Sequence, residues 1–181
     1  MSPIELIKAD LYRYTGAVNT KIILKNLLNN NRSFKYTFWL RLCKSKNFLI
    51  RCIAWYIHRH LSIKYAIQIS KECDIGPGLY LGHSTSIIVS KSAKIGSNCN
   101  LSQFTTIGSN HGKAANIGDN VYIGPNVCLV ENINIGNNAT IGAGSVVLKN
   151  VPENTTFAGN PAKFISEKLP ARYITNPINL R

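Results

Sequence analysis

Acidic residues are scarce in this sequence. The 181 residues contain eight Asp and Glu against 21 Lys and Arg, which gives a formal net charge of +13. Most of the excess lies in residues 1–66, where twelve basic residues accompany only Glu5 and Asp10. Such a surface is either simply solvated or favours anionic partners: a phosphorylated cofactor, an acidic glycan or a membrane face. No DNA- or RNA-binding motif accompanies the charge, so we expect no nucleic-acid partner.

The sequence also lacks paired cysteines and long apolar runs. Its five cysteines, none of them in a C-x-x-C pair, are Cys43, Cys52, Cys73, Cys99 and Cys128. An odd, unpaired set is typical of buried free thiols in a reducing compartment, and it argues against disulfides and a zinc site. The N-terminus has no apolar signal core, and the most apolar run, residues 48–57, is too short to span a bilayer and contains Arg51. These absences predict a cytoplasmic protein.

The sequence does have a six-residue repeat, which runs from Ile117 to Leu148. Aliphatic residues recur at Ile117, Ile123, Leu129, Ile135, Ile141 and Val147. A period of six is neither the 3.6 of an α-helix nor the 2.0 of a strand. It is typical of a hexapeptide-repeat parallel β-helix, in which each unit supplies one short strand and one turn. The predicted fold class is therefore mainly β, a parallel β-helix with the aliphatic side chains inside.

The repeat is less regular toward the N-terminus. A first register includes Ile69, a second includes Val89 and is two residues out of phase, and the third begins ten residues after Ile107. Four extra residues therefore lie between coils, in the segment 109–116. A loop that leaves a regular solenoid is a common place for functional residues.

The chain is predicted to have three parts. Residues 1–66 form a helical N-terminal region, residues 67–151 form the β-helix, and residues 152–181 form a C-terminal cap and tail. Pro152 marks the end of the repeat because proline cannot donate a hydrogen bond to a further coil. The cap is expected to cover the strand edges of the last coil, and the final seven residues are expected to fray.

The N-terminal region shows helix starts in its sequence. Ser2-Pro3 is typical of an N-cap followed by the first helical position, and Asn19-Thr20 is a second start. Residues 29–33 are predicted as a turn, and helical spacing continues from there to His60. These basic, aromatic helices either pack on the solenoid or on neighbouring subunits, or they lie on the surface of the inner membrane.

The sequence contains four histidines. His58 and His60 lie in the helical region, where packing or surface roles are expected. His83 follows the inward Leu81 by two residues, so its ring should project from a turn, and His111 lies in the extra loop. No metal-binding histidine pair and no Gly-x-Ser-x-Gly motif is present, so neither a metal site nor a covalent serine nucleophile is expected. A single histidine at a groove suits general-base catalysis.

The sequence resembles the bacterial serine acetyltransferases and the related capsule and exopolysaccharide O-acetyltransferases. The resemblance covers roughly residues 67–165, and its most specific elements are the runs GLYLGH, SQFTTIG, IGAGSVV and AGNPAK. It implies a left-handed β-helix that associates as a homotrimer, or as a dimer of trimers, and uses acetyl-CoA as donor. It also implies direct transfer, in which His83 deprotonates the acceptor hydroxyl while the acceptor attacks the thioester.

The same resemblance implies where acetyl-CoA binds. Gly108 and Ser109 match the family's glycines that meet pantetheine in the groove between neighbouring solenoids. Pro125 and Ala143 match small-residue positions along that groove. Lys163 matches a position that meets the CoA phosphate as a mobile point charge.

This chain departs from the serine acetyltransferases around the acceptor. That family has aspartate where this chain has Gln68 and Gly82, and a second histidine where this chain has residues 114–116. His111 is a candidate substitute for that histidine. Because a serine acceptor needs partners for its ammonium group, the departures favour a neutral sugar hydroxyl.

Three functions follow from these observations. The first is an acetyl-CoA-dependent O-acetyltransferase that acts on a sugar hydroxyl of a bacterial surface polysaccharide or its precursor. The second is a serine O-acetyltransferase of cysteine biosynthesis, which keeps the fold and the donor. The third is a non-catalytic solenoid that binds a glycan.

Overall fold

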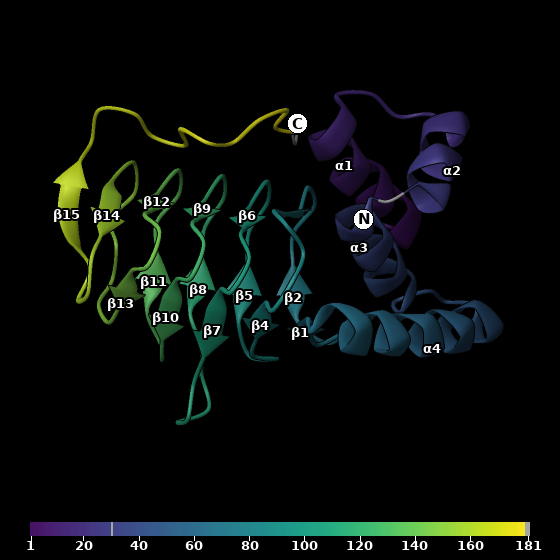
Figure 1. Cartoon of the computed structure of the whole chain (residues 1–181), viewed down its shortest axis with the longest axis horizontal. Coiled ribbons are helices and arrows are strands. Elements are labelled where there is room, and N and C mark those ends of the chain that lie inside the picture. Colours follow the sequence, from purple (N-terminus) through teal and green to yellow (C-terminus); the bar gives the residue numbers. More distant parts are fainter. Residues whose placement is uncertain (30, 180–181) are drawn as a thin grey trace.

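The computed structural model describes residues 1–29 and 31–179 as four helices followed by a solenoid of short strands (Figure 1). The helices are α1 (Pro3–Thr15), α2 (Thr20–Leu28), α3 (Arg32–Leu42) and α4 (Phe48–Tyr65). They gather at one end of the solenoid, and α4 leads directly into the first strand. No helix in the described residues is both long and apolar enough to cross a membrane.

The helix starts follow the local sequence. The Ser2 hydroxyl accepts the N–H of Glu5 at 3.3 Å, and the Glu5 carboxylate accepts the N–H of Ser2, which makes a capping box. Asn19 caps α2 through its side chain, as predicted. The turn prediction for Arg32 and Ser33 is wrong, because the Asn31 side chain caps α3 and both residues are helical. Residue 30, also in that predicted turn, lies outside the described residues.

The strands stack into three parallel sheets, which form the faces of a triangular prism. Sheet A contains β1 (Gln68–Ile69), β4 (Ile88–Val89), β7 (Thr106–Gly108), β10 (Cys128–Val130) and β13 (Val146–Val147). Sheet B contains β2 (Asp74–Ile75), β5 (Lys94–Ile95), β8 (Asn116–Ile117) and β11 (Asn134–Ile135). Sheet C contains β3 (Tyr80–Leu81), β6 (Asn100–Leu101), β9 (Tyr122–Ile123), β12 (Thr140–Ile141), β14 (Thr156–Ala158) and β15 (Lys163–Ser166). The predicted parallel β-helix is confirmed.

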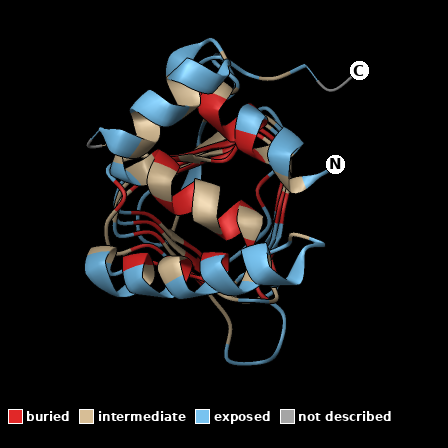
Figure 2. Cartoon of the chain, turned by 90° about the vertical axis from the view of Figure 1, so that its right-hand side faces the viewer, coloured by how far each residue is buried: buried red, intermediate tan, exposed pale blue. Residues whose placement is uncertain are grey.

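The aliphatic repeat fills the prism. The six predicted inward residues from Ile117 to Val147 are all buried, and they pack with their counterparts from earlier coils in one core cluster. Viewed from the helical end, Figure 2 shows buried residues on the inner sides of the helices and along the strands behind them. Pro152 follows Val151, whose isolated bridge to Ile135 ends the row of sheet B. The solenoid core is thus set by the sequence period itself.

Two departures from the period appear as two structural insertions. Leu81 and Val89, inward residues of β3 and β4, are eight positions apart instead of six, and the intervening turn contains His83. Ile107 and Ile117 are ten apart, and the extra residues form the loop that projects from the solenoid in Figure 1. The two-residue phase shift seen in the sequence therefore originates at the histidine turn.

The C-terminal segment caps the last coil and then returns along the prism. β15 pairs antiparallel with β14, as the capping prediction requires. The following chain runs back along sheet C toward α1 (Figure 1). The Asn98 side chain exchanges hydrogen bonds with the backbone of Ile178 at 2.9 and 3.1 Å, and the Thr175 carbonyl accepts a bond from Arg13 at 2.8 Å. The prediction that this end frays is wrong for Thr175 and Ile178, because buried polar side chains bind their backbone groups.

A buried ion pair joins the helices to the first coil. The Arg41 guanidinium donates to both carboxylate oxygens of Asp10, at 2.8 and 3.0 Å, and to the Ile75 carbonyl at 2.7 Å. Asp10 also accepts the N–H of Leu79 at 2.8 Å. Both charged side chains are almost fully buried, so the loss of either one would leave the other as an unpaired buried charge.

Candidate active site

His83 lies in the longer turn between β3 and β4, at the corner where sheet C passes into sheet A. Its backbone is left-handed with a φ of 49°, and Ser86 in the same turn has a φ of 50°. This turn holds the imidazole at the surface, where it is exposed. A left-handed non-glycine residue is uncommon and directs its side chain away from the normal strand alternation. His83 thus stands out of the solenoid wall, as predicted.

A pocket of about 460 Å³ adjoins this turn. It is lined by Tyr14, Asn31, Arg32, Ser33, Tyr80, Leu81, Gly82, His83, Ser84 and Thr85. The helices supply one wall and the β3–β4 turn supplies the other. Tyr14 holds the helical wall against the solenoid. Its hydroxyl accepts the N–H of Leu81 at 2.8 Å, and its ring stacks on that of Tyr80 with 4.5 Å between ring centres. No local sequence pattern predicts this wall, because it depends on contacts between residues more than sixty positions apart.

The pocket contains one cationic side chain, Arg32, and its lining includes no carboxylate. Burial raises the pKa of the Tyr14 phenol well above its usual range, so this hydroxyl keeps its proton. Tyr14 therefore cannot serve as a base at neutral pH. Among the lining residues, His83 is the one whose ordinary chemistry includes accepting a proton near neutrality.

Gln68 and Gly82 occupy the positions that the resemblance assigns to aspartates. Gln68 is exposed on β1, where it pairs with Ile88 of β4, and it does not line the pocket. Gly82 is in the lining, and its N–H donates to the Leu101 carbonyl at 2.8 Å. A Cβ on Gly82 would meet no atom closer than 3.7 Å, so this position beside His83 accepts a side-chain carbon without a clash.

The projecting loop is held by Glu131, a residue that the sequence reasoning missed. The carboxylate accepts the Ser109 hydroxyl at 2.7 Å and the backbone N–H groups of Asn110 and His111 at 3.0 and 3.4 Å. These hydrogen bonds lower the pKa of the Glu131 carboxyl. The pairing of successive coils could have identified it. Val130 pairs with Gly108, so Glu131, the next residue, lies beside the start of the loop.

The loop and the histidine turn lie at opposite edges of sheet A. His83 precedes β4 at the edge with sheet C, whereas His111 follows β7 at the edge with sheet B. The imidazole of His111 is exposed. One chain therefore does not bring His83 and His111 together in one site.

The predicted cofactor residues divide between the same two edges. Pro125 and Ala143 follow β9 and β12, in successive turns of the corner that also carries His83. Gly108 ends β7 and Ser109 begins the projecting loop at the other edge. Lys163 is exposed at the start of β15, where it pairs with Ala158. A ligand that contacts all five would have to extend across more than one surface.

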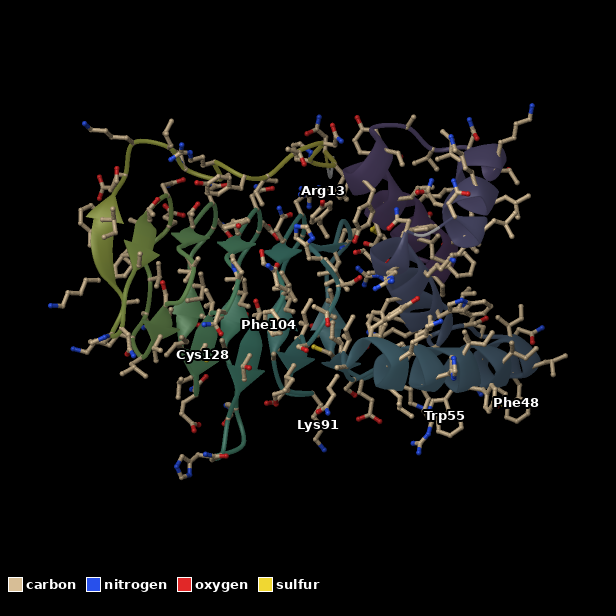
Figure 3. The ribbon with its side chains drawn as sticks, in the orientation of Figure 1. Arg13, Phe48, Trp55, Lys91, Phe104 and Cys128 are labelled. Atoms are coloured by element: carbon tan, nitrogen blue, oxygen red, sulfur yellow. The ribbon has the colours of Figure 1, made fainter. Side chains whose placement is uncertain are left out.

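Phe104 is a second residue that the sequence reasoning did not single out. It lies in the β6–β7 turn, one coil beyond the histidine turn, and its N–H donates to the Thr85 carbonyl at 3.3 Å. Its φ is 60° and the residue is 54% exposed. Figure 3 marks it on the solenoid. A bulky side chain is rare in this backbone conformation, which the equivalent residue of the next coil, Asn126, also adopts with a φ of 57°.

The described residues contain no group of three or more His, Cys, Asp or Glu side chains placed to hold a metal ion. The cysteines are free; Cys43, Cys73 and Cys99 are buried, while Cys52 is exposed and Cys128 is half-buried. The prediction of buried thiols therefore holds for three of the five. Burial raises the pKa of Cys73 to about 11 and that of Cys99 to about 12, so neither is a thiolate nucleophile at neutral pH.

The sequence is similar to known acetyltransferases. Residues 114–149 match the family described as bacterial transferase hexapeptide (six repeats). Over 122 residues the chain is 38% identical to the mitochondrial serine acetyltransferase 3 of Arabidopsis thaliana, a match that covers 65% of this chain and 31% of that protein. The chain spans less than half the length of the curated relatives it matches.

The structure is similar to solved serine acetyltransferases over nearly the whole chain. The soybean serine acetyltransferase apoenzyme superposes with a TM-score of 0.75 at 30% identity, covering 91% of this chain and 69% of that one. A serine acetyltransferase in complex with CoA superposes with a TM-score of 0.73 at 26% identity, covering 90% and 69%. The likeness includes the helices as well as the solenoid.

Proposed function

Because the chain belongs to the hexapeptide-repeat transferase family that includes the serine acetyltransferases, we propose that it is an acetyl-CoA-dependent O-acetyltransferase. The observation that carries the proposal is His83, an exposed histidine on a two-residue insertion beside a pocket that offers no competing base. The similarity to a structure that contains CoA supports acetyl-CoA as the donor.

In the proposed mechanism His83 acts as general base. Its neutral imidazole takes the proton of the acceptor hydroxyl, and the hydroxyl oxygen attacks the thioester carbonyl of acetyl-CoA. The carbon–sulfur bond then breaks, the ester forms, and the imidazolium returns its proton to the departing thiolate. Backbone N–H groups stabilise the oxyanion of the tetrahedral intermediate. No acyl-enzyme is needed, which agrees with the protonated state of Cys73 and Cys99.

Two acceptors are supported by different observations. The named relatives are serine acetyltransferases, and this similarity supports serine better than it supports a sugar. The pocket supports a sugar hydroxyl, as the sequence departures did, because no carboxylate lines it to meet an ammonium group. The aromatic pair of Tyr14 and Tyr80 adds an apolar surface on which a sugar ring can stack. The surface-polysaccharide acceptor therefore stays a prediction beside serine.

The test of activity is CoA release with acetyl-CoA and either L-serine or a panel of bacterial polysaccharides and their sugar precursors. His83→Ala should lower kcat by roughly 10²- to 10⁴-fold while CoA binding persists, because general-base catalysis is worth about that much. His60→Ala, at an exposed position of α4, is the matched control and should retain full activity. Glycan binding without any CoA release would identify a non-catalytic solenoid, and equal activity of His83→Ala would remove this histidine from the mechanism.

Gly82→Asp separates the two acceptors. A Cβ at Gly82 meets no atom closer than 3.7 Å, and the change adds a carboxylate at the residue next to His83. If the native acceptor is a sugar, kcat/KM for serine should rise from near background and kcat/KM for the sugar should fall. If wild-type protein already turns over serine in preference to every glycan tested, the sugar acceptor is wrong.

We also propose that the active enzyme is a homotrimer in which the outer face of sheet A meets a neighbouring copy. The outward side chains of sheet A are Gln68, Ile88, Thr106, Cys128 and Val146, whereas those of sheet B are Asp74, Lys94, Asn116 and Asn134. Sheet A is thus the more apolar face, and it lies between the histidine turn and the projecting loop. Contact through it could set His83 of one copy near His111 of the next.

The mass of the assembly in solution tests this arrangement. Ile88→Glu places a charge on this face, on the second of its five strands, and should release monomers with little activity, whereas Lys94→Glu on sheet B should leave the assembly intact. A monomeric wild-type protein with full activity would contradict the shared site.

A further inference from the structure

The outward side of α4 exposes an unusual number of apolar residues. Seven of the eighteen large hydrophobic side chains exposed in the described residues belong to this helix: Phe48, Leu49, Ile50, Ile53, Trp55, Tyr56 and Ile63. Tyr56 is 71% exposed and Ile63 is 76% exposed. Its buried residues are Ala54, His58 and Leu61. In Figure 3, Phe48 and Trp55 point away from the body of the molecule. Packing within the chain therefore leaves most of the apolar surface of this helix exposed.

The charge around this surface is mostly positive. Residues 11–71 contain twelve Lys and Arg and no Asp or Glu. Arg13 and Arg41 are buried in the helix–solenoid junction. The exposed cations on α4 and its flanks are Lys44, Lys46, Arg59, Lys64 and Lys71. Glu72 and Asp74 are exposed just beyond Lys71, but the cations on this surface outnumber them, and an apolar surface with mostly positive borders matches a partner that is apolar within and anionic at its boundary.

A groove of about 360 Å³ runs along part of this surface. It is lined by Arg51, Cys52, Trp55, Tyr56 and Lys71. The Arg51 guanidinium lies 5.5 Å from the ring centre of Phe48, and the Lys71 ammonium lies 6.0 Å from that of Trp55. The groove therefore has aromatic walls with a cation at each side, a combination that can receive a phosphate group above an apolar chain.

We propose that this α4 face, defined by the seven exposed apolar residues and the groove, docks on the anionic surface of a lipid bilayer. The helix lies in the plane of the interface, its apolar side chains enter the boundary between headgroups and acyl chains, and the flanking cations pair with lipid phosphates. A second copy of the chain is a poorer occupant, because a symmetric contact would set Arg59 and Lys64 close to identical charges. A soluble polyanion would satisfy the cations and leave the apolar side chains in water.

Co-sedimentation of the full chain with vesicles tests the proposal. Wild-type protein should bind vesicles made of equal parts phosphatidylglycerol and phosphatidylcholine, should bind them more weakly at high salt, and should not bind phosphatidylcholine alone. Leu49→Glu with Tyr56→Glu should lower the partition about tenfold or more, because two side chains lose their burial in the interface. Leu24→Glu with Leu28→Glu, which changes two exposed leucines of α2, is the matched control and should bind as wild type does.

Tryptophan fluorescence reports the same event at one residue. Emission should shift to shorter wavelength when anionic vesicles are added, and Trp55→Phe should abolish the shift, because Trp39 packs against the core. Equal loss of binding in both double variants, or no binding at low salt, would overturn the proposal. So would an assembly in lipid-free solution that the Leu49→Glu and Tyr56→Glu changes dissociate, since that result identifies a second copy as the occupant.

Discussion

At the scale of single residues, His58 shows how burial alters an ordinary group. Its ring lies 4.9 Å from Tyr36 on the inner side of α4, and its Nε2 atom has no hydrogen-bond partner among the described residues. Burial, with a smaller effect from the positive charge of Lys71, lowers the pKa of His58 to about 4. The sequence predicted a packing or surface role, and the structure confirms packing.

This pKa predicts an acid-sensitive stability. In the unfolded chain His58 titrates near 6.5, so its contribution is complete above that pH and declines as the pH falls toward 4. The loss can reach ~3 kcal/mol at 1.36 kcal/mol per pKa unit. Urea unfolding midpoints at pH 7 and pH 5 should therefore differ less in His58→Phe than in wild type. His60→Phe, at an exposed position, should keep the wild-type difference, and an unchanged difference in both variants would contradict the prediction.

At the scale of elements, the β-helix could be predicted from the repeat because every coil meets the same steric requirement. Each inward aliphatic fills the same prism, so the period in the sequence is the period in space. The caps at Ser2 and Asn19 were readable for a similar reason, since a cap needs only residues within one turn. The start of α3 was missed because an asparagine suits both a turn and an N-cap.

Close contact between coils gives the second prediction, at Gly96. A Cβ there would lie 2.5 Å from the Gly118 carbonyl oxygen in the next coil, a backbone atom that cannot move without displacing the coil. Gly96→Ala should therefore lower the melting temperature by roughly 5 °C or more, the scale of an overpacked core. Gly82→Ala meets no atom within 3.7 Å and should melt as wild type does. Thermal unfolding followed by circular dichroism measures both, and equal midpoints would show that the coils can separate freely.

At the scale of the whole molecule, the individual elements could be predicted from the sequence, but the contacts between distant elements could not. His83 was identified from its position after an inward residue, but the helical wall of its pocket depends on Tyr14 and Arg32, which are distant in sequence. Glu131 became visible only when coil pairing set it beside Ser109. The final seven residues were predicted to fray because the ends of a chain are usually poorly ordered. Hydrogen bonds between polar groups far apart in the chain leave no periodic pattern in the sequence, so these features are visible only in the three-dimensional structure.

The tail supplies the third prediction. The Asn100 amide donates to the Tyr173 carbonyl at 3.0 Å, and the Tyr173 ring lies 4.6 Å from that of Tyr122. A chain that ends at residue 168 loses these contacts and the acceptor of Arg13, so its free energy of unfolding should fall by about 1–3 kcal/mol for the buried groups left unpaired. Denaturant titration measures the loss. Leu169→Ala, at an exposed residue of the same segment, should change it little, and a truncated chain of full stability would show that the tail is passive.

The returning tail also orders events during synthesis. Thr175 leaves the ribosome 162 residues after Arg13, and Ile178 leaves it 80 residues after Asn98. The N-terminal helices and the early coils therefore keep these bonds unmade until residues 175–178 have been synthesised. Arrival of this segment, rather than completion of any one coil, makes them.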